Sequence, residues 1–161
     1  MAEPLYLRIV LPAGHQRMVQ ERQESPSSAA RPGSVMYKTH VIAVVDDDEA
    51  MRTSLSSLLR ASGYQVFCYA APADYLDSDG PVQTDCLISD IQMPGMGGLQ
   101  MLDALRARGW RMPVIFVSAD QSGLLCAKFR EADVVACLRK PFAADELLAW
   151  VEFAPRKSEN T

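Results

Sequence analysis

Five polar residues suited to metal and phosphate chemistry each follow a short apolar run of the chain. They are Asp46, Asp47, Asp90, Ser118 and Lys140. Carboxylates gathered at one place repel one another and raise one another's pKa unless a cation lies among them. Mg²⁺ suits such a set, because it takes one or two carboxylates, keeps several waters and completes its octahedron with a phosphate oxygen.

The same residue types could also accept a phosphoryl group. An aspartate can act as a nucleophile and form an acyl phosphate, and in-line transfer needs positioning and charge neutralisation more than covalent help. Lys140 could pair with phosphoryl oxygens, and Ser118 could donate a hydrogen bond to another. The chain contains no glycine-rich loop for binding a nucleotide. The pattern therefore predicts phosphorylation of an aspartate beside a magnesium ion.

The elements that must position these residues alternate along the chain. Short apolar runs predict strands, and apolar residues at helical spacing predict helices between them. The expected strands are 40–45, 65–69, 85–89, 113–117 and 134–138, and the expected helices are 50–62, 73–77, 98–108, 122–132 and 143–153. This alternation predicts an α/β fold, a doubly wound five-stranded parallel sheet with helices on both faces. Ligands bind at the carboxyl ends of such strands, where the five polar residues would converge.

Composition divides the chain into three parts. Residues 1–38 contain a stretch of Gln, Glu, Arg, Ser, Pro and Gly with almost no large apolar residues, so they are expected to be a disordered N-terminal extension. An upstream start codon is an alternative explanation, since Met36 directly precedes the patterned region. Residues 39–154 form the expected folded domain, and 155–161 a polar tail.

Charge and hydropathy exclude some classes of partner. The formal charge over residues 41–161 is −6, from seventeen acidic and eleven basic side chains. Direct nucleic-acid binding is not expected, because it depends on Lys and Arg neutralising phosphates. No apolar run approaches the ~18 residues of a membrane span, and the N-terminus lacks the features of a secretory signal. The expected location is the cytoplasm.

The four cysteines are scattered and form no C-x-x-C motif. They are Cys68, Cys86, Cys126 and Cys137. In a reducing compartment such residues are expected to be small buried apolar side chains. Nothing in their spacing places two thiols side by side.

Four sequence blocks, in their order and spacing, resemble the receiver domains of two-component response regulators, the CheY-like family. The blocks are VDDDE at 45–49, SDIQMPGMGG at 89–98, VSA at 117–119 and KPF at 140–142. The resemblance covers about residues 41–153 and implies a flavodoxin-like strand order, 2-1-3-4-5. Residues 67–70 and 74–76 also resemble the receivers of FixJ-type transcription regulators.

The resemblance implies a role for each matching residue. Asp90 would accept the phosphoryl group from a partner sensor histidine kinase, Ser118 would move toward that group, and Lys140 would bridge to it. The Lys140–Pro141 bond would be cis. Mg²⁺ would be held by Asp47 directly, by Asp46 mainly through a water, by Asp90, and by the backbone carbonyl of Gln92. The resemblance implies no enzyme activity beyond Mg-dependent self-phosphorylation and autodephosphorylation.

The chain departs from the family at the residues that report phosphorylation. Cys137 stands where the family usually has Tyr or Phe, three residues before Lys140. We therefore expect a switch through closure of the loop after Ser118 and repacking of Leu124, Leu125 and Phe129. Gln92 and Asp120 flank the expected phosphoryl site, where side chains can help or block the attacking water.

Several functions stay open at this stage. The leading one is a stand-alone receiver that signals to an unknown output protein, with homodimerisation on phosphorylation as a further expectation. The alternative is the receiver portion of a FixJ-like transcription regulator that lacks its DNA-binding domain. A phosphatase-like enzyme using Asp90 would want a second carboxylate, which Gln92 does not provide. A degenerate receiver is disfavoured, because the five polar residues are all present.

Overall fold

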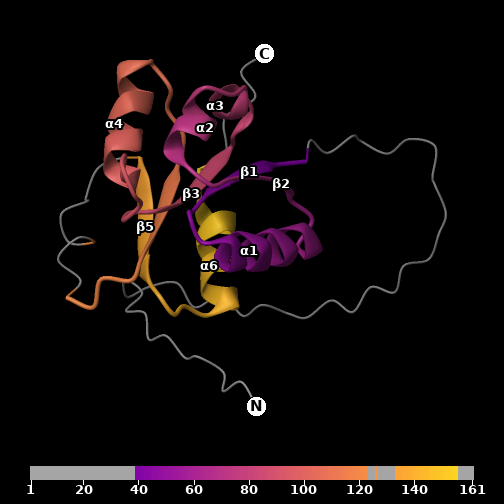
Figure 1. Cartoon of the computed structure of the whole chain (residues 1–161). Helices are drawn as coiled ribbons and strands as arrows, with labels where there is room; N and C mark the ends of the chain where they lie inside the picture. Colours follow the sequence, from indigo (N-terminus) through magenta and orange to yellow (C-terminus); the bar gives the residue numbers. More distant parts are fainter. Residues whose placement is uncertain (1–38, 123–125, 127–132, 156–161) are drawn as a thin grey trace, which may run out of the picture. The chain divides into compact units, whose positions relative to one another are not determined.

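The residues that the structure describes form one five-stranded parallel sheet. The computed structural model describes residues 39–122, 126 and 133–155 (Figure 1). Neighbouring strands run in the order β2-β1-β3-β4-β5, and every pair is parallel. The strands are β1 Val41–Val45, β2 Gln65–Tyr69, β3 Cys86–Asp90, β4 Val114–Ser118 and β5 Val134–Arg139. The predicted fold class and strand order are both confirmed.

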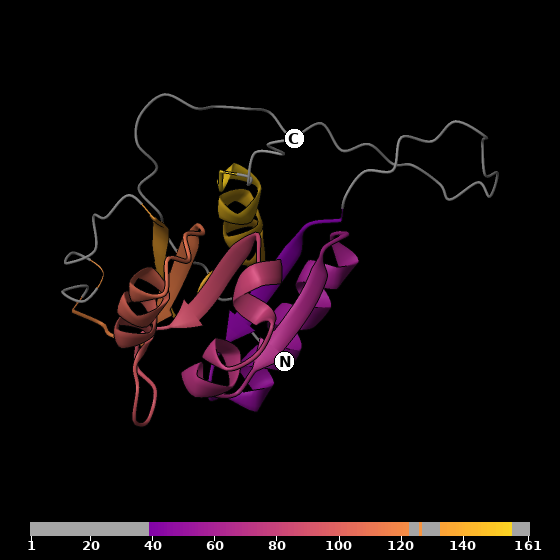
Figure 2. The ribbon, with the colours of Figure 1, turned by 90° about the horizontal axis from the view of Figure 1, so that it is seen from above.

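Helices cover both faces of this sheet (Figures 1 and 2). They are α1 Glu49–Ala61, α2 Pro72–Leu76, α3 Gly80–Gln83, α4 Gly98–Ala107 and α6 Ala144–Phe153. Asp48 begins α1 by accepting hydrogen bonds from the backbone N–H groups of Ala50 and Met51, which would otherwise have no partner. Gly63 follows α1 with φ of +93°, a conformation that glycine adopts without strain.

The strands of the sheet centre are buried because helices lie on both sides. Every residue of β1, β3 and β4 is buried, as expected for continuous apolar runs in a parallel sheet. One core cluster joins alternate strand residues to helices α2 and α4: Ala43, Val45, Leu87, Phe116, Tyr75, Leu76, Met101, Leu102 and Leu105. On the other face, α1 and α6 bury Leu55, Leu59, Leu147 and Val151.

The predicted elements agree with the observed ones to within a residue or two at each end. The short helix α3 was not predicted. The expected helix 122–132 falls largely outside the described residues, as do the expected extension 1–38 and most of the polar tail. Among the helices that the structure describes, none is long and apolar enough to cross a membrane.

The cysteine prediction was wrong for three of the four residues. Cys126 and Cys137 form a disulfide with their Cα atoms 5.5 Å apart. Cys68 is exposed and only Cys86 is a buried free thiol. Cys68 is exposed because β2 is an edge strand with three exposed residues. The spacing of the cysteines did not reveal that Cys126 and Cys137, eleven residues apart in the sequence, lie side by side.

The amino ends of the strands close a small cavity at the edge of the sheet opposite to that of Asp46 and Asp90. His40, Tyr64, Asp85 and Pro155 are among the residues that line it. The carboxylate of Asp85 accepts a hydrogen bond of 2.9 Å from the backbone N–H of Val41. The two ends of the described domain therefore lie beside the same cavity.

Candidate functional site

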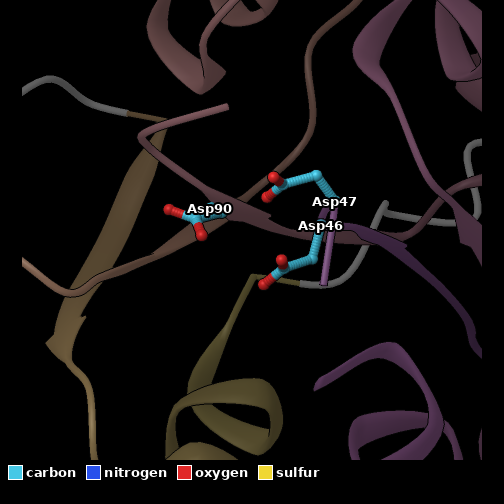
Figure 3. Close-up of side chains that lie close together, drawn as sticks. All are labelled: Asp46, Asp47 and Asp90. Carbon is cyan, nitrogen blue, oxygen red and sulfur yellow. The ribbon is translucent and has the colours of Figure 1, made fainter. Parts of the chain in front are cut away.

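The carboxyl ends of four strands bring the predicted polar residues together. Asp46 directly follows β1, Asp90 ends β3, Ser118 ends β4 and Lys140 directly follows β5. These strands are neighbours in the sheet, so their ends lie at one edge. Figure 3 shows the side chains of Asp46, Asp47 and Asp90 lying close together. The predicted convergence is confirmed.

Three carboxylates form the centre of the site. Each of Asp46, Asp47 and Asp90 offers an oxygen, and these atoms lie within 4.8 Å of one another. Asp46 and Asp90 are buried, at 1% and 7% exposure, while Asp47 is exposed. The site therefore has a buried floor and one side open to solvent.

Backbone hydrogen bonds fix the two buried carboxylates. Oδ1 of Asp46 accepts from the N–H of Asp48 at 2.9 Å, and Oδ1 of Asp90 accepts from the N–H of Gln92 at 3.0 Å. Nη1 of Arg52 also donates to the backbone carbonyl of Asp46 at 2.7 Å. Each aspartate keeps its other oxygen, Oδ2, directed to the centre of the site.

Lys140 joins these two remaining oxygens. Its Nζ lies 3.1 Å from Oδ2 of Asp46 and 2.8 Å from Oδ2 of Asp90. The bond from Lys140 to Pro141 is cis, as predicted. Burial lowers the pKa of Lys140, but its hydrogen bonds to Asp90 and Asp46 outweigh that effect and leave the pKa raised. The ammonium is therefore charged at neutral pH.

Ser118 is buried at the end of β4, beside this cluster. Its hydroxyl oxygen accepts a hydrogen bond of 3.0 Å from the N–H of Asp120, and its carbonyl accepts one of 2.7 Å from the N–H of Lys140. A hydroxyl that accepts keeps its own proton as a donor. The backbone of Ser118 is thus held to β5 while its hydroxyl retains a proton to donate.

Two further residues, Gly98 and Arg139, contact the backbone around the site, and neither was a predicted site residue. Gly98 begins α4 so close to Asp90 that a Cβ atom there would overlap the Asp90 carbonyl oxygen. Nη2 of Arg139 donates to the backbone carbonyl of Gln121 at 2.7 Å, in the loop after β4. Gly98 carried a signal in the SDIQMPGMGG block, whereas nothing in the sequence indicated that the exposed side chain of Arg139 bonds the loop after β4.

The charges of the site fit a divalent cation. Among the described residues, Lys140 forms ion pairs with Asp46 and Asp90, and Asp47 adds a third carboxylate to the cluster, so one positive charge faces three negative ones. Burial raises the pKa of Asp46 despite its hydrogen bonds to Asp48 and Lys140, and a cation among the carboxylates would favour its charged form. Oxygen ligands with one side open to water are the donors that Mg²⁺ prefers. The acidic triad is therefore typical of a magnesium site.

Comparisons with known proteins agree with this geometry. The response regulator receiver domain family matches residues 42–152. The chain is 35% identical over 124 residues to the response regulator protein TmoT of Ectopseudomonas mendocina. The aligned residues cover 74% of this chain and 56% of TmoT. It is 36% identical over 110 residues to the transcriptional regulatory protein FixJ of Azorhizobium caulinodans. The aligned residues cover 68% of this chain and 52% of FixJ.

Solved structures show the same fold. The chemotaxis protein CheY4 of Vibrio cholerae superposes with a TM-score of 0.66 at 24% identity, over 73% of this chain and all of CheY4. The crystal structure of FixJ-N gives a TM-score of 0.62 at 25% identity, over 72% of this chain and 93% of FixJ-N. The chain spans about half the length of the curated relatives it matches. The family match over residues 42–152 includes Asp46, Asp47 and Asp90, and the chain belongs to the response regulator receiver domains of two-component signalling.

Proposed function

We propose that Asp90 accepts a phosphoryl group from a phosphohistidine of a partner sensor histidine kinase. The observation that carries the proposal is the contact of Lys140 with Oδ2 of both Asp46 and Asp90. It holds a carboxylate nucleophile beside a fixed cation and a second carboxylate, the arrangement that in-line phosphoryl transfer requires.

In the proposed reaction, a carboxylate oxygen of Asp90 attacks the phosphorus of the phosphohistidine. The P–N bond breaks and its electron pair stays on the imidazole nitrogen. The other ring nitrogen keeps its proton, so the product histidine is neutral. Asp90 becomes an acyl phosphate. Mg²⁺ held by Asp46, Asp47, Asp90 and the backbone carbonyl of Gln92 would neutralise charge on the phosphoryl oxygens.

Two side chains of the site then respond to the new group. Lys140 already contacts Asp90, so its ammonium needs only to shift its hydrogen bond from the carboxylate to a phosphoryl oxygen. Ser118 turns its hydroxyl proton toward the same group, which requires the loop after β4 to move. The added charge thereby becomes a change of loop conformation.

The central test is phosphorylation by a small phosphodonor. The protein is incubated with acetyl phosphate and Mg²⁺, and intact mass spectrometry measures the gain of one phosphoryl group. Asp90→Asn should abolish the gain, whereas Asp103→Asn, the same change on the exposed face of α4, should leave it unchanged. Labelling that persists in Asp90→Asn would rule out Asp90 as the acceptor.

The output of the switch is a second proposal. The chain is proposed to act in the cytoplasm as a stand-alone receiver that signals to another protein or to a second phosphorylated copy. The alternative is the receiver portion of a longer FixJ-like transcription regulator, which the length of the matched relatives favours. The size of the native protein on an immunoblot, together with the full reading frame, decides between them.

A further inference from the structure

A disulfide joins the segment after β4 to strand β5. Cys126 lies in the segment between the two strands, and Cys137 lies within β5, opposite Phe116 of β4 in the sheet register. Both cysteines are partly buried and pack against the core cluster that contains Phe116. The bond is therefore internal to the domain, at the position where family members usually carry an aromatic residue.

Among the residues that the structure describes after β4, this disulfide is one of three attachments to β5. Ser118 pairs with Arg139 in the sheet, and its carbonyl accepts from the N–H of Lys140. Further along, Arg139 donates to the carbonyl of Gln121. Ser118, Gln121 and Cys126 are thus each attached to β5 or to the residue that follows it. Only the last attachment is covalent, and a thiol can reverse it.

We propose that Cys126 and Cys137 form a redox site that takes low-molecular-weight disulfides and thiols as co-reactants and controls the phosphorylation response. In the oxidising direction, the thiolate of one cysteine attacks a small disulfide such as oxidised glutathione and releases one thiol. The second cysteine then attacks the mixed disulfide and releases the other. Two protein thiols lose two electrons and two protons, and one small disulfide becomes two thiols.

The other two cysteines are unsuited to this chemistry, which makes them internal controls. Cys86 is buried, and burial together with the charge of Asp85 raises its pKa to about 12, so it holds almost no reactive thiolate at neutral pH. Cys68 is exposed and has no disulfide partner among the described residues. In reducing compartments, disulfides are mostly transient and sense the redox state, which is the role assigned here to the pair.

The effect on signalling rests on the proposed function, whereas formation of the disulfide does not. Closure of the loop on a phosphoryl group requires the stretch after Ser118 to move, and the disulfide fixes the far end of that stretch to β5. The oxidised protein should therefore accept the phosphoryl group less readily than the reduced protein. Coupling between two equilibria is reciprocal, so any factor by which oxidation lowers the equilibrium extent of phosphorylation is also the factor by which phosphorylation favours reduction of the disulfide.

The first experiment measures the disulfide alone. The protein is equilibrated with defined ratios of reduced to oxidised glutathione, then denatured and alkylated, and the alkyl groups are counted by mass. Two should be found on the oxidised protein and four on the reduced protein, with peptide mapping showing the Cys126–Cys137 link. Cys126→Ser should abolish the transition and Cys68→Ser should retain it. Four free thiols at every ratio, or a link between other cysteines or between chains, would overturn the proposal.

The second experiment measures the coupling. Phosphorylation by acetyl phosphate with Mg²⁺ is followed on oxidised and reduced wild-type protein, so that no substitution can disturb folding. The reduced form should be phosphorylated faster by about fivefold or more, in the range of typical coupling between sites, and Cys126→Ser should match it in both conditions. Equal rates in the two wild-type forms would overturn the control of phosphorylation. No phosphorylation in either form would overturn the proposed function while leaving the glutathione result intact.

Discussion

Nζ of Lys140 lies 2.8 Å from Oδ2 of Asp90, although 50 residues separate them in the sequence. The strands that carry them are not neighbours, because β4 lies between β3 and β5. The side chain therefore crosses the end of β4 and reaches both β3 and, through Asp46, β1. One ammonium holds the ends of three of the five strands in a fixed electrostatic relation.

Replacing Lys140 should destabilise the protein in a manner that depends on pH. Lys140→Ala removes a charged partner from two buried carboxylates, and each such hydrogen bond contributes about 1.5–3 kcal/mol. The raised pKa of Lys140 means that its contribution is fully present below the unfolded value of 10.5 and is lost as the pH rises through the folded value. Urea unfolding at neutral pH and above pH 11 measures both effects.

The control for Lys140 is Arg111→Ala, which breaks an exposed ion pair with Asp133. Surface pairs contribute less than about 1 kcal/mol, so this change should be small at any pH. Two results would contradict the charge assigned to Lys140. One is a loss of unfolding free energy for Lys140→Ala at neutral pH that is as small as the loss for Arg111→Ala. The other is a loss for Lys140→Ala that does not diminish in strong base.

Magnesium should stabilise the folded protein through the three carboxylates. A ligand at about 100 times its dissociation constant adds about 2.7 kcal/mol to the free energy of unfolding. Asp46→Asn should lose most of this response, because it removes one ligand charge from the floor of the site. Thermal unfolding with Mg²⁺ and with chelator provides the measurement.

Asp48→Asn is the matched control for Asp46→Asn, since it is the same substitution two residues away. Asp48 caps α1, and asparagine caps helices about as well as aspartate. This variant should keep the full response to Mg²⁺. An equal loss of the Mg²⁺ response in both variants would contradict the role of Asp46 as a ligand. It would mean that any loss of negative charge at residues 46–48 weakens binding.

Gly98→Ala should disturb Asp90 without touching its side chain. The new Cβ would overlap the Asp90 carbonyl and also approach the side chains of Phe116 and Ser89 at 3.1 Å. Overpacking of this kind costs about 1–3 kcal/mol or more, and here it falls on the backbone of the proposed acceptor. We expect lower stability and slower phosphorylation, measured by denaturant unfolding and by mass. Gly97→Ala, whose Cβ would meet only Ile91 O at 2.9 Å closely, should be milder in both respects.

Gln92 and Asp120 should set the lifetime of the acyl phosphate. Gln92 is exposed two residues after Asp90, and Asp120 stands two residues after Ser118. Asp120→Asn removes a carboxylate that can orient the attacking water, so hydrolysis should slow, by less than the ~10² of a dedicated general base. Gln92→Ala should change the lifetime without weakening binding of Mg²⁺. Unchanged decay of the phosphorylated mass in both variants would contradict this role.

The fold was predictable because its local signals agree with one another. The β-branched runs of β1 and β4 are buried on both faces, and this is the environment that continuous apolar strands require. Asp48 and Gly63 mark the two ends of α1 in the sequence as they do in the structure. Because parallel strands end at one edge, the positions of Asp46, Asp90 and Lys140 followed from the strand assignments alone.

Contacts between separated loops were not predictable in the same way. The hydrogen bond of Arg139 to Gln121 and the link of Cys126 to Cys137 both depend on the path of the chain after β4. No periodicity encodes that path, and eleven residues separate the two cysteines. The helix α3 escaped prediction because its four residues begin with glycine and proline, which more often indicate a turn. The roles of Leu124, Leu125 and Phe129 concern positions outside the described residues and stay predictions.

The small cavity that His40 and Pro155 both line has a practical consequence. The first and last described segments of the domain meet there, about one strand length, or ~17 Å, from Asp90. Domain boundaries that lie side by side, far from a site, are the geometry that tolerates circular permutation and insertion into a host protein. The receiver could therefore be transplanted as a cassette, with both junctions at one edge and the acidic site left open.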